Sequence, residues 1–364
     1  MGDAQRVLIV GATGITGYSA CVAFREAGWH VFGLARNPEK LPSGVTPVQA
    51  DVRDAAGLAK ALADINPTHV VFATWSRQST EAENIRVNVA MLAAVLDALE
   101  SAPLEHVSLV TGLKHYMGPF EAYAKSPAAT PFHESQERLS YPNFYYDQED
   151  LLFARAVSQG FTWTVHRAST IIGWAIGNAM NMGVTLAVYG AICKASDRPF
   201  VFPGSPQQWS GIVDVVDARQ LAAQILWAAH APKARDEAFN ITNGDVFRWR
   251  EMWGHVAHDL DVPAAPYPGA AQPLEQQMVD AEPIWNFVVE DANLVPHSLS
   301  DLVSWWHTDA DLGRPIEAFA DNSKSRDAGF LTYQTTRRSF HDLFAQLRAA
   351  RIIPERNWRP SRIV

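Results

Sequence analysis

Short apolar runs alternate with longer amphipathic runs along the first half of the chain. Residues 7–10, Val-Leu-Ile-Val, form the first apolar run, and its branched side chains are typical of a strand buried on both faces of a parallel sheet. An amphipathic run over 18–27 follows and predicts a helix. Strands that alternate with helices in this way predict a doubly wound α/β fold. The pattern places further strands over 29–34, 45–50, 68–74, 107–111 and 162–166, with helices over 55–63, 81–99 and 143–158.

Three glycines separate the first predicted strand from the first predicted helix. Gly11 permits a tight turn, Gly14 lets a pyrophosphate approach the backbone because it has no Cβ, and Gly17 lets the helix pack closely on the strand. The helix N-terminus then offers N–H groups and a partial positive charge to phosphates. A glycine triplet also fits a tight turn without a ligand, but its place directly after a buried strand favours a dinucleotide site of Rossmann type.

Arg36 stands at the end of the second predicted strand. In dinucleotide-binding folds an acidic residue at this point binds the ribose 2′-hydroxyl, whereas an arginine accommodates the 2′-phosphate of NADP. No Asp or Glu occupies the end of this strand. We therefore expect Arg36 to select NADP; the alternative is an arginine that is only solvated at the surface.

The ends of the third and fourth strands carry further candidates for the cofactor site. Asp51 could contact the adenine amino group and Val52 its ring, although Asp51 and Asp54 both precede a predicted helix and could instead cap it. Thr74 and Trp75 follow the fourth strand. Ligands bind beyond the carboxyl ends of the strands in such sheets, so we expect Thr74 and Trp75 to line the cofactor cleft.

The alternation of strands and helices breaks after residue 173. A helix is predicted over 178–195, short strands over 200–203 and 238–242, and a helix within 214–229, and tryptophans are frequent in the remainder. We expect an NADP-binding domain over 1–175 and a smaller C-terminal lobe over 176–364 that covers the substrate. Segments at about 210–242 are expected to return to the sheet.

Composition and charge exclude several classes of protein. The net charge of −9 argues against nucleic acid as a partner, and no run approaches the ~18 apolar residues of a membrane span. The N-terminus leads directly into the first strand, so we expect no signal peptide. Cys21 and Cys193 lie far apart in apolar surroundings, which predicts buried reduced thiols in the cytoplasm. No cluster of Cys and His has the spacing of zinc ligands, so no metal is expected.

The tyrosines near residue 145 lack the partner that short-chain dehydrogenases and reductases usually provide. In those enzymes a lysine four residues after the catalytic tyrosine lowers the pKa of the phenol and holds the nicotinamide ribose. Glu149 occupies that position relative to Tyr145, and Tyr116, Tyr141 and Tyr146 also lack the lysine. Lys114, just after the fifth strand, is the candidate to replace it.

Two motifs resemble one family closely. Thr-Gly-Leu-Lys-His-Tyr-Met-Gly-Pro-Phe over 111–120 and Asn-Phe-Tyr-Tyr-Asp-Gln-Glu-Asp over 143–150 resemble the progesterone 5β-reductase/iridoid synthase-like enzymes, atypical extended short-chain reductases. The resemblance extends from Val7 to about Phe330. Its departures are Ala168, where the family usually has proline, Asn178-Ala179-Met180 in place of Ser-Met-Met, and Asn37, where a second arginine is common.

The resemblance implies NADPH-dependent reduction of the C=C bond of α,β-unsaturated carbonyls, with Tyr145 and Lys114 as catalytic residues. Hydride addition to the β-carbon places negative charge on the carbonyl oxygen, and the Tyr145 phenol would stabilise this enolate. Tyr146 is the competitor for the donor role because it is adjacent in sequence. The expected cofactor contacts are Gly11, Thr13, Gly14, Ile15, Gly17, Arg36, Asn37, Asp51, Val52, Thr74, Trp75, Tyr145, Ile171, Asn178, Ala179 and Met180.

Two alternatives remain open at this point. An extended short-chain carbonyl reductase or epimerase could use the same tyrosine, and a regulatory protein could keep the NADP site without catalysis. Retention of both Tyr145 and Lys114 argues against the regulatory protein. We expect a small-molecule enone as the substrate and NADPH as the cofactor, with no nucleic acid or membrane partner; a homodimer is one assembly that the sequence leaves open.

Overall fold

The computed structural model describes residues 5–118 and 129–364, and contacts within the chain divide it into two units. Unit 1 comprises Met1–Ser169, Ala218–Thr242 and Ala320–Thr332, and unit 2 comprises Thr170–Asp217, Asn243–Phe319 and Tyr333–Val364. Each unit is described by itself below. The domain boundary predicted at residue 175 stays a prediction, because each unit combines several segments of the chain.

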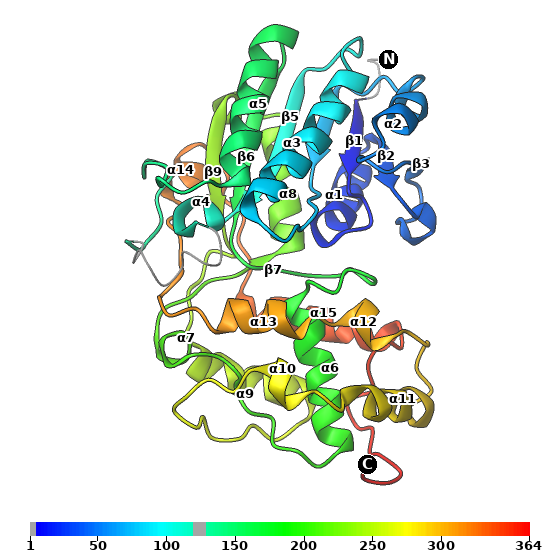
Figure 1. Cartoon of the computed structure of the whole chain (residues 1–364), viewed down its shortest axis with the longest axis vertical. Coiled ribbons are helices and arrows are strands. Elements are labelled where there is room, and N and C mark those ends of the chain that lie inside the picture. The colour runs from blue at the N-terminus through cyan, green and yellow to red at the C-terminus, as the bar shows by residue number, and fades with distance from the viewer. Residues whose placement is uncertain (1–4, 119–128) are drawn as a thin grey trace. The chain divides into compact units, whose positions relative to one another are not determined.

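A seven-stranded parallel sheet forms the centre of unit 1 (Figure 1). The strand order is β3-β2-β1-β4-β5-β6-β9, and every neighbouring pair is parallel. The chain moves outward from β1 first on one side and then on the other, so the predicted doubly wound sheet is confirmed. The strands are β1 (Arg6–Val10), β2 (His30–Ala35), β3 (Thr46–Gln49), β4 (His69–Phe72), β5 (His106–Gly112), β6 (Thr162–Ala168) and β9 (Glu237–Ile241).

Helices of unit 1 pack in two groups. α1 packs against α8, whereas α3 packs against both α2 and α5. The apolar sides of α2, α3 and α5 share one core with the central strands. This packing explains the apolar stripes of the amphipathic runs. The helices are α1 (Ile15–Glu26), α2 (Ala55–Leu62), α3 (Glu81–Ala98), α4 (Lys114–Met117), α5 (Phe144–Gln159), α8 (Ala218–Ala228) and α14 (Ser323–Asp327), with 3-10 turns η1 (Pro38–Lys40) and η3 (Pro232–Ala234).

The strands predicted in the second half of the chain have different outcomes. The run over 238–242 corresponds to β9, which joins the main sheet beside β6. The run over 200–203 is not a strand, because Phe200 makes only an isolated bridge with Ala264. Pro199 precedes this run and Pro203 is its last residue, and neither has an N–H to extend a ladder.

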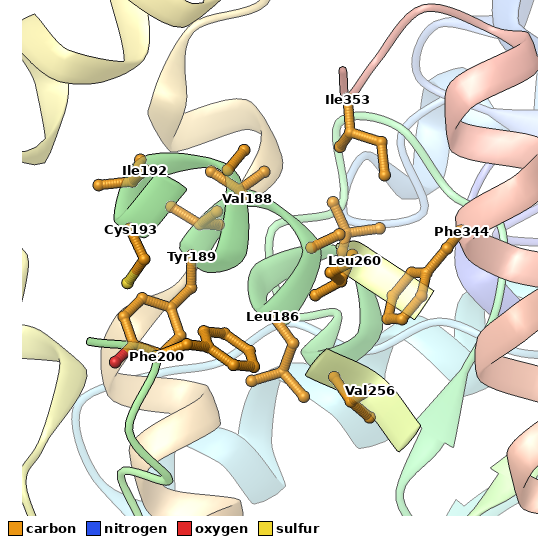
Figure 2. Packing of buried hydrophobic residues seen from close by; sticks show 14 of the residues in the cluster. Leu186, Val188, Tyr189, Ile192, Cys193, Phe200, Val256, Leu260, Phe344 and Ile353 are labelled. Carbon is orange, nitrogen blue, oxygen red and sulfur yellow. The ribbon is translucent and has the colours of Figure 1, made fainter. Parts of the chain in front are cut away.

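Helix α6 (Met182–Ala195) lies at the centre of unit 2, and nearly all of its residues are buried. It packs against α9 (Trp249–Leu260), α11 (Ala281–Asp291), α13 (Trp305–Leu312) and α15 (Thr336–Ala349). Figure 2 shows Leu186, Val188, Tyr189 and Ile192 of α6 among apolar side chains of other elements. The remaining elements of unit 2 are β7 (Ile171–Ile172), β8 (Val216–Asp217), α7 (Pro206–Ser210), α10 (Leu274–Gln277) and α12 (Leu299–Leu302).

Candidate active site

The turn between β1 and α1 has the conformation that its glycines predict. Gly11 adopts a φ of +86°, in the left-handed region that favours glycine, and its N–H and that of Ala12 both donate to Leu34 O, at 3.0 and 3.1 Å. A Cβ on Gly11 would lie 2.8 Å from the Cβ of Thr74, and one on Gly17 would collide with the carbonyl oxygen of Gly11. The turn therefore admits only glycine at both positions.

The N-terminus of α1 fits a phosphate group. Gly14 is the N-cap residue and has an extended backbone, and no side chain caps the N–H groups of the first turn. No acidic residue lies in that turn, whose first residue is Ile15, and Thr13 precedes the cap. Twelve-residue α1 thus begins with unfilled donors and the positive end of its dipole, which is what a pyrophosphate requires.

Arg36 and Asn37 lie directly after β2, and both are exposed. The carbonyl of Arg36 accepts a hydrogen bond from Gln49 Nε2 at 3.3 Å, which ties this backbone to the end of β3. The side chain of Asn37 accepts from the N–H of Glu39 and caps η1. The Arg36 backbone is thus anchored at the end of β2, where a 2′-phosphate is expected, and its side chain is exposed.

Asp51 and Val52 follow β3, and the structure assigns the helix cap to another residue. Asp54 is the N-cap of α2, because its Oδ1 accepts from the N–H of Gly57 at 3.1 Å. Asp51 instead binds the guanidinium of Arg53, with an Oδ2–Nη2 distance of 2.6 Å, and this hydrogen bond lowers the pKa of Asp51 to about 2. Val52 is buried. Contact of Asp51 and Val52 with adenine stays a prediction.

Trp75 connects the end of β4 to the start of α5. Its ring stacks on that of Phe144, with a centroid distance of 5.7 Å and an interplanar angle of 12°. Thr74, like Trp75, is half-buried, and it touches the glycine turn at Gly11. The end of β4 therefore contacts both the glycine turn and the helix that carries Tyr145.

Lys114 and Tyr145 come from different elements and meet around Phe144. The Lys114 Nζ lies 5.1 Å from the centroid of the Trp75 ring and 5.4 Å from that of Phe144. The ring of Tyr145 lies 4.4 Å from the Phe144 ring, and a Cβ on Gly112 would lie 3.5 Å from the Tyr145 hydroxyl. The half-buried phenol is thus placed at the carboxyl end of β5.

Tyr146 is held by contacts within the protein. Its side chain is buried, and its hydroxyl donates to His115 O at 2.5 Å and accepts from the N–H of Leu139 at 3.1 Å. Burial raises the pKa of Tyr146. The hydroxyl hydrogen of Tyr146 is thus engaged by a backbone carbonyl, which supports a structural role for this side chain.

Glu149, at the position of the missing lysine, is buried beside two arginines and a histidine. Its carboxylate lies 3.0 Å from Arg138 Nη2, 3.4 Å from Arg167 Nη2 and 3.4 Å from His115 Nδ1. Burial acts to raise the pKa of Glu149, but the contacts with His115 and Arg167 outweigh it and hold this pKa below its usual range. Burial lowers the pKa of His115, so its ring is neutral near pH 7. Glu149 is therefore an ionised carboxylate whose negative charge is balanced by Arg138 and Arg167.

Asn143 is a residue of this site that the sequence analysis did not single out. It is the N-cap of α5, and its buried side chain accepts from the N–H of Tyr145. Asparagine just before an amphipathic run is a common N-cap signal, which could have identified it. Pro119 and Phe120, the last residues of the first motif, lie outside the described residues.

Four of the predicted cofactor residues belong to unit 2. Ile171 pairs with Val216 in the ladder of β7 and β8. Asn178, Ala179 and Met180 are half-buried and precede Asn181, the N-cap of α6. Their part in a cofactor site stays a prediction.

Two negative observations apply to residues 5–118 and 129–364. Within these ranges no group of His, Cys, Asp and Glu side chains has an arrangement that could hold a metal ion. None of the helices in the same ranges combines the length and the apolar character needed to cross a membrane.

Comparison with known proteins shows both family and fold. Residues 7–242 match the model of the NAD dependent epimerase/dehydratase family. The chain is 37% identical over 369 residues to an (S)-8-oxocitronellyl enol synthase of Camptotheca acuminata, and the match covers 97% of this chain and 94% of that protein. It is 36% identical over 361 residues to a 3-oxo-Delta(4,5)-steroid 5-beta-reductase of Arabidopsis thaliana, with coverages of 95% and 92%.

Solved structures with the same fold share little sequence. A UDP-glucose 4-epimerase of Thermus thermophilus in complex with NAD superposes with a TM-score of 0.67 at 17% identity, covering 95% of this chain and 100% of that chain. A UDP-glucose 4-epimerase of Thermotoga maritima gives a TM-score of 0.68 at 13% identity, with coverages of 95% and 99%. These similarities support the fold alone.

Proposed function

This chain belongs to the NAD dependent epimerase/dehydratase family, and within it to the progesterone 5β-reductase/iridoid synthase-like enzymes, and we propose that it reduces the C=C bond of α,β-unsaturated carbonyl compounds with NADPH. The observation that carries this proposal is the placement of the Tyr145 phenol at the end of β5, with Lys114 beside the same aromatic cluster. The names of the relatives, an enol synthase and a steroid 5-beta-reductase, agree with it.

The glycine turn and Arg36 would hold the cofactor. The open first turn of α1 would bind the pyrophosphate through N–H groups, and the exposed guanidinium of Arg36 would bind the 2′-phosphate. When bound, the nicotinamide supplies the hydride that adds to the β-carbon of the enone. Thr74 and Trp75 would border the cofactor at the end of β4.

Tyr145 would act on the carbonyl oxygen of the substrate. Its phenol donates a hydrogen bond that strengthens as the oxygen becomes an enolate, and loss of one such donor costs roughly 3 kcal/mol in comparable oxyanion sites. Lys114 would orient the site and add positive charge, because its ammonium group is held against two aromatic faces. The enolate can take its proton at carbon later, so the hydride step needs no full proton transfer from Tyr145.

A direct test compares 2-cyclohexen-1-one with cyclohexanone as substrates for the purified protein. We expect NADPH oxidation with the enone only, and cyclohexanone as the product by mass spectrometry. Faster reduction of cyclohexanone to its alcohol would instead identify a carbonyl reductase. Tight NADPH binding without turnover, across enones of increasing size, would identify an NADP-sensing protein.

We also propose a cytoplasmic location and a homodimeric assembly. Cys21 and Cys193 are free and buried, and burial raises the pKa of each thiol to about 12, which keeps them protonated and unreactive. Such thiols suit a reducing compartment. Fractionation of the source cells tests the location, and light scattering of the purified protein tests the assembly.

A further inference from the structure

The two proposed catalytic side chains lie on different helices, unlike those of most short-chain reductases. There the tyrosine and the lysine lie one turn apart on one helix, which fixes their separation. Here Lys114 begins α4, and Tyr145 is the second residue of α5. Contacts between α4 and α5 must therefore set the position of the lysine relative to the phenol.

Asn143 contacts the backbone of both residues. Its Nδ2 donates to the carbonyl oxygen of Lys114 at 2.7 Å, and its Oδ1 accepts from the N–H of Tyr145 at 3.1 Å. Only 2% of Asn143 is exposed, so water does not compete for these hydrogen bonds. One planar carboxamide thus fixes the distance between the start of α4 and the start of α5.

Two other side chains of α5 contact α4 at the residue that follows Lys114. Tyr146 donates to His115 O at 2.5 Å, and Glu149 lies 3.4 Å from His115 Nδ1. Both contacts reach the residue after Lys114. The Asn143 side chain, in contrast, binds both the Lys114 backbone and the Tyr145 backbone.

We propose that Asn143 is a positioning residue that holds Lys114 against Trp75 and Phe144, in register with Tyr145. This proposal rests on the proposed function only for its effect on turnover. It also predicts that the Lys114 ammonium leaves the aromatic faces when the Asn143 amide is lost. This prediction does not depend on the substrate.

Asn143→Asp separates this role from helix capping. Aspartate caps helices about as well as asparagine, so the hydrogen bond from Tyr145 N–H is kept. The donor to Lys114 O is lost, and a carboxylate oxygen faces that carbonyl instead. Asn143→Ser is the second variant: serine also caps, but its hydroxyl is too short to replace the amide at Lys114.

Asn243→Asp is the matched control in unit 2. Asn243 is also fully buried, its Oδ1 accepts from Asp217 N–H at 2.7 Å, and its Nδ2 donates to the hydroxyls of Thr336 and Ser339, both at 3.2 Å. The variant makes the same chemical change at a side chain whose hydrogen-bond partners here are Asp217, Thr336 and Ser339. We expect a comparable loss of thermal stability with turnover close to that of the unaltered protein.

The first readout is the NMR signal of Lys114 after reductive methylation of the lysines with ¹³C-formaldehyde. The signal is assigned to Lys114 because it is absent from the spectrum of Lys114→Met. The faces of Trp75 and Phe144 should shift it upfield, since Nζ lies 5.1 and 5.4 Å from their centroids. We expect this shift to disappear in Asn143→Asp and Asn143→Ser and to persist in Asn243→Asp. An unchanged signal in both Asn143 variants would overturn the proposal, whatever their activity.

The second readout is a double-mutant cycle on kcat with 2-cyclohexen-1-one. If Asn143 acts through Lys114, Asn143→Asp should lower kcat by no more than Lys114→Met does and should add less than about twofold in the Lys114→Met background. Fully additive losses would show that Asn143 acts by another route and would also overturn the proposal. Loss of the NMR shift in a protein without enone turnover would support the positioning role while refuting the proposed function.

Discussion

Three histidines of the sheet should make unit 1 sensitive to mild acid. His69, His106 and His166 lie on β4, β5 and β6 and are 3%, 4% and 0% exposed. Burial lowers their pKa values to about 4, 3 and 4. The rings of His69 and His106 are also only 6.0 Å apart, so protonation of one opposes protonation of the other. All three side chains are therefore neutral in the folded protein near pH 6.

The size of the effect follows from proton uptake by the unfolded chain. An unfolded histidine has a pKa of about 6.5, so it binds a proton as the pH falls below that value, while these folded side chains stay neutral until about pH 4 or lower. Stability is thus complete above pH 6.5 and is lost as the pH falls. Between pH 7 and pH 5 each histidine should reduce the free energy of unfolding by about 2 kcal/mol, and the three together by about 6 kcal/mol. A domain has only about 5–15 kcal/mol in total.

Urea unfolding followed by circular dichroism at pH 7, 6 and 5 measures this loss. His106→Gln removes one titrating ring, so the variant should lose about 2 kcal/mol less than the unaltered protein between pH 7 and pH 5. Thr162→Val is the control: it removes the hydroxyl that lies 2.9 Å from His106 Nδ1 but keeps the ring. It should be less stable at every pH with the full pH dependence. An equal pH dependence in His106→Gln would refute the reasoning.

The remaining predictions concern the site. Arg36→Ala should raise the KM for NADPH far more than that for NADH, and steady-state kinetics with an NADH preference in the unaltered protein would contradict the selector role. Tyr145→Phe should lower kcat on enones about 100-fold with NADPH binding intact, whereas Tyr146→Phe should mainly lower the melting temperature. Lys114→Met should cost less than Tyr145→Phe and leave the shape of the pH profile unchanged; a basic limb shifted by more than about one unit would indicate pKa tuning. Gly17→Ala should abolish NADPH binding in calorimetry, because its methyl group meets the carbonyl oxygen of Gly11.

Much of the sheet could be predicted because its signals are local. The strands are apolar runs whose ends lie near glycines and polar residues. A parallel strand buried on both faces can be identified from its own run of apolar residues, without knowledge of the strands that pair with it. The glycine turn was predictable in the same way, since Gly11 and Gly17 are required by backbone geometry within a few residues. The motif that contains Lys114 placed this residue just after the fifth strand, and the structure has it there, at the start of α4 after β5.

The finer arrangement of the site depends on contacts between distant parts of the chain. Tyr145 and Tyr146 are adjacent in one motif, and only the position of His115 O shows that the Tyr146 hydroxyl binds the backbone. Spacing showed that Glu149 replaces a lysine, but not that Arg138 and Arg167 compensate its charge. These partners lie on separate elements, and local sequence does not specify their approach.

The glycine turn and Arg36 also place opposite constraints on how this enzyme can change. The turn is so closely packed that Gly11 and Gly17 have no tolerated replacement, whereas Arg36 and Asn37 project from the end of β2 into solvent and support no core. Substitution of Arg36 therefore carries little penalty in folding, and substitution of Asn37 costs the cap of η1. On the proposed role of Arg36, preference between the two nicotinamide cofactors is an evolvable trait, separable from the ability to bind a dinucleotide at all. Descendants of this sequence could exchange one reductant pool of the cell for the other by surface substitutions alone.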